Sequence, residues 1–152
     1  MTMHLDDWPH IGAFNFRMKG FLNYTTKHYF KHYQLRLWDR VAKYYFSKNQ
    51  KYDDFCIGSK KRHKVLMDLI LDFKRTYKST ANNLVLMHYV ENSHDTNLRF
   101  NWIDNDLFSF LEKGYNENLF EDTAIFLFSD HGARFNDKRK SNTGYLEERL
   151  PL

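Results

Sequence analysis

Two continuous apolar runs stand out in the pattern of hydrophobic and polar positions along the chain. One covers residues 84–90 and is largely continuous, the other covers residues 124–128, and polar residues bound both of them. A short apolar run of this kind is typical of a strand that is buried on both faces of a parallel sheet. The pattern therefore predicts two core strands.

Helical periodicity marks the segments before and between these runs. Apolar residues recur at three- and four-residue steps over residues 25–47, 59–78 and 101–113, which predicts three helices. Gly114 is expected to end the third helix. Because this helix lies between the two predicted strands, the pattern indicates a strand–helix–strand unit with a right-handed crossover. We therefore expect an α/β fold with a mostly parallel sheet flanked by helices.

Polar clusters follow both predicted strands. His94 and Asp95 come after the first strand, and Asp130 and His131 come directly after the second. Ligands collect beyond the carboxyl ends of parallel strands, so these side chains are expected to approach one another. A carboxylate beside an imidazole supplies two ligands that suit zinc and related divalent metals. In the alternative interpretation, Asp130 caps a turn and His131 is an ordinary surface residue.

Composition and charge limit the class of protein. A chain of 152 residues with 42% hydrophobic and 28% charged residues is long enough for one domain with a core. The net charge of +4 permits acidic partners without implying them. The densest basic run, residues 60–64, opens a predicted helix and is interpreted as a solvated helix end. No nucleic-acid partner is therefore predicted.

The remaining segments add one candidate residue. The amino terminus is acidic and polar rather than basic and then apolar, so no signal peptide is predicted, and no run approaches the ~18 apolar residues of a membrane span. Cys56 is the only cysteine, so this chain alone can form no internal disulfide.

Residues 1–24 show no sustained period. Arg17 could clamp an anion if a pocket lies nearby, and is otherwise a surface residue.

Several motifs resemble the animal family called domain of unknown function 229. The order and spacing of the matching residues agree over nearly the whole chain. They are Asp7-Trp8-Pro9 with Gly12, Phe14 to Arg17 with Gly20-Phe21, Cys56 and Gly58, Ser93-His94-Asp95 with Asp104 and Asp106-Leu107, Ser129 to Gly132, and Leu146 to Pro151.

This family is similar to the alkaline phosphatase and sulfatase superfamily. The resemblance implies a partial α/β sandwich, an extracellular or secretory location, a divalent metal (zinc, calcium, magnesium or manganese) and a phosphate or sulfate ester substrate. Asp130 and His131 match the metal-binding pair of that superfamily. His94 matches a histidine that faces the substrate anion, and Arg17 matches a substrate-contacting arginine of lipoteichoic-acid-synthase-like members. Departures at Asn136, Ser141 and Thr143 weaken the match in the loop after the pair.

The resemblance also implies segments that are not recognised in this sequence. One would carry the nucleophile and the first metal-binding acid, and another would carry further metal ligands. Residues 1–152 are therefore expected to form one incomplete domain, in which no catalytic nucleophile is identified. Two functions remain open. The chain is a fragment of a metal-dependent hydrolase that is inactive alone, or a degenerate, non-catalytic relative that acts as an interaction domain and has not retained the metal.

Overall fold

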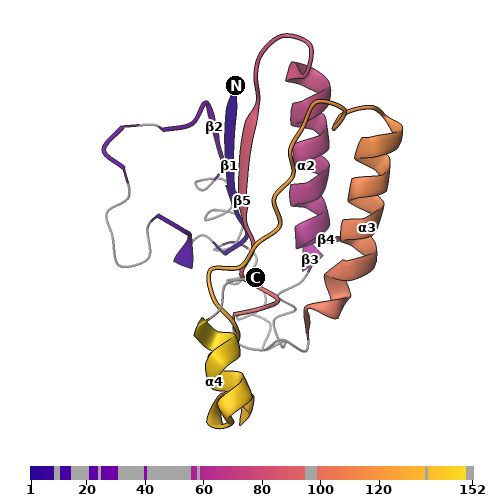
Figure 1. The fold of residues 1–152 in the computed structure, drawn as a ribbon. Coiled ribbons are helices and arrows are strands. Elements are labelled where there is room, and N and C mark those ends of the chain that lie inside the picture. Colours follow the sequence, from indigo (N-terminus) through magenta and orange to yellow (C-terminus); the bar gives the residue numbers. More distant parts are fainter. Residues whose placement is uncertain are drawn as a thin grey trace. The chain divides into compact units, whose positions relative to one another are not determined.

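The computed structural model describes residues 1–8, 11–14, 21–23, 25–30, 40, 56–57, 59–94, 99–135 and 137–149. The chain forms two compact units, Met1–Tyr89 and Val90–Leu152. Figure 1 labels the helices and strands of both units, and each unit is described by itself.

The first unit contains a parallel sheet of three strands in the order β2-β1-β5. The central strand β1 (Thr2–Asp6) pairs with β2 (His28–Tyr29) on one side and with β5 (Leu84–His88) on the other (Figure 1). The predicted α/β class, the mostly parallel sheet and the strand at residues 84–90 are confirmed. The central strand β1 was not predicted.

Strand β1 is buried on both faces, since all but its first residue are buried. Its two faces still differ, because apolar and polar side chains alternate along it. Met3 pairs with His28, whose ring contacts Phe73 and Tyr77 of helix α2 (Arg62–Tyr77) at centroid distances of 5.4 and 5.3 Å. Side chains alternate between the faces of a strand, and residues paired in parallel register share a face. The face with Met3 and Leu5 therefore lies under α2, and the alternate positions, which are polar, lie on the opposite face.

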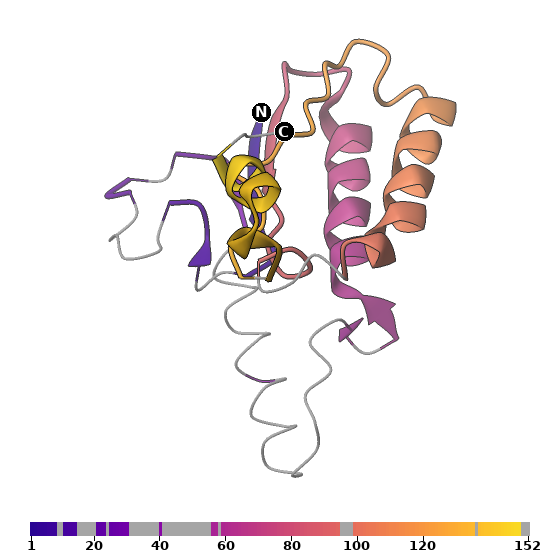
Figure 2. The same ribbon diagram turned by 60° about the horizontal axis from the view of Figure 1, so that its bottom comes forward.

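A short antiparallel hairpin leads into α2. It consists of β3 (Cys56–Ile57) and β4 (Lys60–Lys61), drawn just before the helix in Figure 2. The predicted helix at residues 59–78 is confirmed, and its predicted apolar stripe supplies core residues such as Leu66 and Phe73. The basic run that precedes it is solvated only in part, because Lys60 and Lys61 are exposed whereas Arg62 is buried.

The second unit contains helix α3 (Asn101–Asn116), the 3₁₀ helix η3 (Asp137–Lys140) and helix α4 (Asn142–Arg149). The predicted helix at residues 101–113 is confirmed, but Gly114 does not end it. Gly114 lies inside α3, where a Cβ would collide with the ring of Phe120. The left-handed residue after the helix is Asn118, with φ of 54°. Gly114 therefore serves close packing instead of helix termination.

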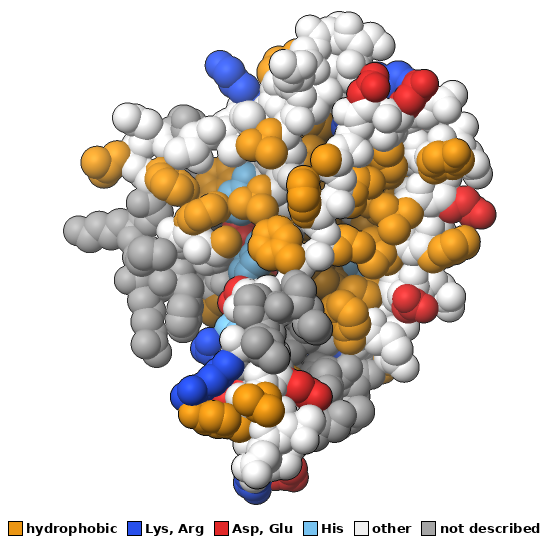
Figure 3. Space-filling view, in the orientation of Figure 1, with side chains coloured by type: hydrophobic (Ala, Val, Ile, Leu, Met, Phe, Trp, Pro, Cys, Tyr) orange, Lys and Arg blue, Asp and Glu red, His pale blue; other side chains and the backbone are white. Residues whose placement is uncertain are grey.

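The prediction of a buried strand at residues 124–128 is wrong. Within the part of the chain that the structure describes, this segment belongs to no strand, and Phe126 and Phe128 are 80% and 74% exposed. Figure 3 shows hydrophobic side chains on the surface turned to the viewer. An apolar run indicates that a segment favours burial, but it does not supply the strand that must pair with it. Only the first strand and the helix of the predicted strand–helix–strand unit are observed.

The predicted helix at residues 25–47 is wrong at its start. His28 and Tyr29 form β2 instead, since they pair with β1 in parallel register. Residues 31–39 and 41–55, which hold most of that prediction, lie outside the described residues. Among the helices that are described, none is long and apolar enough to cross a membrane.

Candidate functional site

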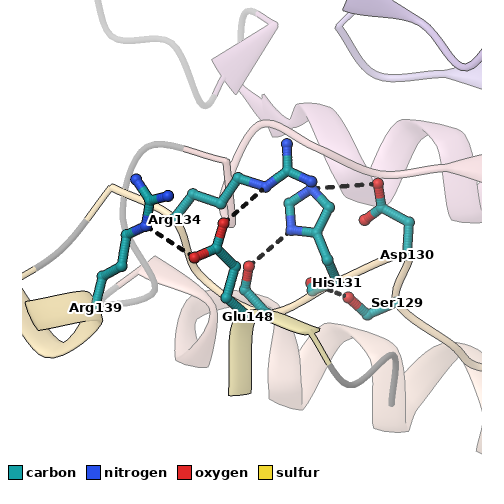
Figure 4. A network of polar contacts seen from close by, with 7 residues as sticks. Ser129, Asp130, His131, Arg134, Arg139 and Glu148 are labelled. Atoms are coloured by element: carbon teal, nitrogen blue, oxygen red, sulfur yellow. Dashed lines mark hydrogen bonds and ion pairs between the residues drawn. The ribbon is translucent and has the colours of Figure 1, made fainter. Parts of the chain in front are cut away.

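The Asp130–His131 pair lies in the second unit, at the end of the extended segment that follows α3. The Nδ1 atom of His131 lies 2.7 Å from the carbonyl oxygen of Gly132, and the Nε2 atom lies 3.4 Å from Oδ2 of Asp130 (Figure 4). The carboxyl group of Asp130 is 82% exposed and the imidazole of His131 is 29% exposed. The pair is therefore open to solvent and to a solute.

These two contacts define how the imidazole can act. A backbone carbonyl only accepts hydrogen bonds, so Nδ1 of His131 is the donor and carries the proton. In the neutral ring, Nε2 then holds a lone pair that faces the carboxylate oxygen of Asp130. Two acceptors in this position attract a proton or a metal cation between them. A histidine that donates its other ring N–H to a backbone carbonyl is the usual arrangement of a metal ligand.

Helix α4 supports the loop that carries this pair. The backbone of Gly132 lies against the last turn of α4, where a Cβ on residue 132 would collide with the carbonyl group of Glu147. On the other side of the pair, the Ser129 hydroxyl donates a hydrogen bond of 2.6 Å to the carbonyl oxygen of His131. Glycine is therefore required at position 132 by a close backbone approach, in addition to any turn that it makes.

A carboxylate on α4 adds ion pairs to the same contact. Glu148 accepts a 2.8 Å hydrogen bond from Nε of Arg139, and its other oxygen lies 3.6 Å from Nε of Arg134 (Figure 4). The structure thus brings together the Ser129–Gly132 motif and the described part of the second motif, residues 146–149.

The other two predicted site residues have different outcomes. His94 is exposed in the second unit, where its ring packs on that of Phe135 at a centroid distance of 5.1 Å. This contact places His94 against the loop that follows the Asp130–His131 pair. Arg17 lies outside the described residues, as does Asp95. The described residues contain no group of three or more His, Cys, Asp or Glu side chains that could hold a metal ion, so the pair supplies two ligands.

A second polar cluster, which sequence reasoning missed, lies in the first unit on the sheet face opposite α2. Its centre is Asp6, whose Oδ1 atom lies 3.1 Å from Nδ1 of His88 and whose Oδ2 atom lies 3.4 Å from Nε2 of His4. The backbone N–H of Ala13 donates a 3.3 Å hydrogen bond to Oδ1 as well. We call these three side chains, His4, Asp6 and His88, the β1–β5 cluster. Parallel register places Asp6 directly opposite His88.

The electrostatics of this cluster favour an ionised Asp6. Burial alone would raise the pKa of Asp6, but the contacts of its carboxylate with His4, His88 and the Ala13 N–H outweigh it, so that the pKa lies well below its usual range. The pKa of Tyr29 is raised by burial and by the negative charge of Asp6. The ring of Tyr29 stacks on that of His4, and Phe14 contacts the His4 ring edge-on. His4 is thus held between two aromatic rings.

One signal in the sequence could have revealed this cluster. Met3, His4, Leu5 and Asp6 alternate apolar and polar side chains, the pattern of a strand, although the run is short and both of its faces are buried. His88 lies within the largely apolar run at residues 84–90, and nothing in that run marks it as a site residue. Its pairing with Asp6 depends on the register of two strands that are distant in the sequence.

The parallel sheet with helices, together with polar side chains at the ends of its strands, defines an α/β protein. The sequence profile of the family described as "Protein of unknown function (DUF229)" matches residues 1–152, and the chain belongs to this family. No curated protein and no solved structure gives a significant match to the chain.

Proposed function

We propose that this chain carries part of the active site of a metal-dependent hydrolase of phosphate or sulfate esters. The observation that supports this most directly is the hydrogen bond from Nδ1 of His131 to the Gly132 carbonyl, which leaves Nε2 beside Oδ2 of Asp130. Nitrogen and oxygen ligands on adjacent residues suit zinc, and oxygen-rich completion of the site would suit magnesium, manganese or calcium.

In this proposal each residue has a defined role. Nε2 of His131 and the carboxylate of Asp130 would hold the metal, and the Gly132 carbonyl would orient the imidazole. A bound divalent metal in such a site supplies positive charge that stabilises the anionic ester group and activates the attacking oxygen. His94, on the adjacent Phe135 ring, would contact the ester anion, and Arg17 would do so through its planar guanidinium. The family resemblance supports an extracellular or secretory location.

A second candidate function is favoured by the small size of the ligand set. Two ligands alone hold a metal weakly, and the described residues supply no third one. The exposed apolar side chains at residues 125–128 would suit a contact with another protein. The chain would then be a non-catalytic interaction domain, and the Asp130–His131 pair would be a remnant of the hydrolase site.

Calorimetric titration of this chain with zinc and with manganese tests the hydrolase proposal. We expect metal binding in the millimolar range, which is lost in both Asp130→Ala and His131→Ala. Asp137→Ala is a matched control, because Asp137 is an almost fully exposed carboxylate in the same unit that pairs only locally with Lys140. Binding that survives both substitutions at the pair would overturn the proposed site. Tight zinc binding that is abolished by Asp130→Ala would instead exclude the non-catalytic alternative.

We expect negligible hydrolysis of phosphate and sulfate esters by this chain alone, because two metal ligands cannot position both a nucleophile and such an ester. Hydrolysis of a generic phosphate ester and a generic sulfate ester, measured with and without added metal, checks this expectation. Metal-dependent turnover by the chain would show that the site is more complete than two ligands.

A further inference from the structure

The β1–β5 cluster is not used by the proposed function, and it has features of a proton-transfer site. Asp6 is fully buried, and its Oδ1 atom meets Nδ1 of His88 at 3.1 Å. The side chain of His88 is 34% exposed, so it is partly open to solvent. A buried carboxylate that holds one nitrogen of a partly exposed imidazole is the arrangement in which histidine acts as a general base.

The hydrogen bond determines which nitrogen of His88 can accept a proton. Asp6 is ionised and only accepts hydrogen bonds, so Nδ1 of His88 carries the proton that is shared with Oδ1. The lone pair of the neutral ring is then on Nε2. When Nε2 takes a second proton, the positive charge of the imidazolium lies next to the negative charge of Asp6, which stabilises it.

The rest of the cluster explains why His88, and not His4, is the residue that meets a substrate. His4 also contacts Asp6, but it is buried and lies between Phe14 and Tyr29. Its Nε2 atom engages the second oxygen of Asp6, and the Ala13 N–H is a further donor to the first. His4 and Ala13 therefore fix the carboxylate, and the carboxylate fixes His88. The backbone N–H of Asp7 donates to the carbonyl oxygen of His88 at 3.2 Å, which holds the end of β5 in place.

The position in the sheet is the one where ligands are found in α/β proteins. Asp6 and His88 are the last residues of β1 and β5, which run parallel, so the cluster lies at the carboxyl edge of the sheet. A general base at this edge takes its proton from an O–H group, so water or an alcohol is the ligand that suits it.

We propose that His88, oriented by Asp6, is a general base for a neutral hydroxyl compound, which is water or an alcohol. In the step, the O–H bond breaks, its electron pair stays on oxygen, and the proton passes to Nε2 of His88, while Nδ1 keeps the proton that it shares with Asp6. The oxygen then bonds to an electrophilic carbon or phosphorus, and the bond from that atom to its leaving group breaks. The leaving group keeps the bonding electron pair and takes the proton from Nε2 of His88. His88 is the catalytic residue in this scheme, and Asp6 is a positioning residue.

The first test is the protonation pattern of the His88 ring, read from long-range proton–nitrogen NMR spectra of the nitrogen-labelled chain near neutral pH. We expect the Nδ1–H form in the native protein. Asp6→Asn should reverse the pattern to Nε2–H, because the amide group can donate to Nδ1. The His88→Gln variant identifies the His88 ring signals, because those signals are missing from its spectrum. An Nε2–H ring in the native chain, or an Nδ1–H ring that persists in Asp6→Asn, would overturn the proposal. The native spectrum tests the Nδ1–H form of His88 even if a variant fails to fold.

The second test is hydrolysis of p-nitrophenyl acetate with a chelator present, so that metal bound at Asp130 and His131 contributes nothing. Water adds to the acetyl carbon, and acetate and p-nitrophenol are released. We expect His88→Gln and Asp6→Asn each to lower the protein-dependent rate by about tenfold or more. His28→Gln is the control, because this imidazole lies in the same sheet on the α2 face. An unchanged rate in folded His88→Gln would overturn this proposal. That result would say nothing against the proposed metal site at Asp130 and His131.

Discussion

The carbonyl carbon of Glu147 lies so near Gly132 that a Cβ on residue 132 would stand 2.6 Å from it. The obstacle is the backbone of α4, which cannot rotate away as a side chain can. We expect Gly132→Ala to destabilise the chain by roughly 1–3 kcal/mol, the usual cost of overpacking. Urea denaturation followed by circular dichroism measures this loss.

Gly114→Ala provides a comparison for that result, because the added Cβ meets the ring of Phe120 instead of backbone. Replacing the ring with a smaller side chain, in the double variant Gly114→Ala with Phe120→Leu, should recover stability. No truncation of a single side chain should restore the stability of Gly132→Ala, because the obstacle there is backbone. Equal stability of Gly132→Ala and the native chain would show that α4 does not pack on the loop in this way.

The lowered pKa of Asp6 predicts a specific pH dependence of folding. Because the folded-state pKa lies below the unfolded value of 3.8, the unfolded chain binds more protons in acid. The stabilisation from Asp6 is therefore present above that unfolded value and is lost as the pH falls through the lower folded-state pKa.

Asp6→Asn should remove this contribution. We expect a loss of about 1–3 kcal/mol at neutral pH, from the charged hydrogen bond to His88 and the contact with His4, and a flatter stability curve in acid. Urea denaturation across a pH series measures both. Asp72→Asn is the control, because Asp72 is an exposed residue of α2 that pairs with Arg75. An acid limb that is as steep in Asp6→Asn as in the native chain would contradict the prediction.

Glu148 joins α4 to Arg134 and Arg139, and both arginine side chains are about half exposed. Water and salt screen such pairs, so we expect Glu148→Gln to cost only a few tenths to about 1 kcal/mol, and less at high salt. Denaturation at low and high ionic strength checks this. Asp137→Asn removes a more exposed pair with Lys140 and should have no measurable effect. A loss in Glu148→Gln that salt does not reduce would indicate a contribution other than charge.

Metal binding at the Asp130–His131 pair should weaken as the pH falls, because protons compete with the metal for Nε2 of His131. An oxygen-only site would differ, because its carboxylates stay ionised near neutral pH and metal binding there would hardly change. Zinc titrations at several pH values, with proton release recorded in buffers of different ionisation enthalpy, test this. Binding that is independent of pH would remove His131 from the ligand set.

The exposed apolar run should limit solubility. Phe126 and Phe128 are mostly exposed, so replacing both with serine removes little buried surface. We expect the double variant to be more soluble and equally stable, and light scattering together with thermal unfolding measures the two properties. A large loss of stability would show that these rings are buried in solution by a contact that the structure does not contain.

The sequence was most informative where periodicity is long or apolar content is continuous. Helices α2 and α3 and strand β5 follow from such patterns, because many residues contribute to each of them. Strand β1 has only five residues and two buried faces, so its alternation was too short to recognise. The run at residues 124–128 has the composition of a strand, but a strand also needs a partner, and local sequence does not specify one.

The candidate sites also differ in how far local sequence could predict them. The adjacent residues Asp130 and His131 form a contact that the sequence alone could suggest, whereas His94 reaches their loop through Phe135, which no motif indicated. The β1–β5 cluster depends on register between distant strands, and its members are unremarkable when they are taken one at a time. A site formed by strand pairing can be predicted only when the pairing itself is known.

The hydrogen bond between Asp6 and His88 spans 82 positions of the chain. It can form only after β1 and β5 have met, and closing so long a loop is a slow event in folding. The His88 ring signals therefore report when the sheet has assembled, and they should reach their native values later than the signals of α2, which depends on local contacts.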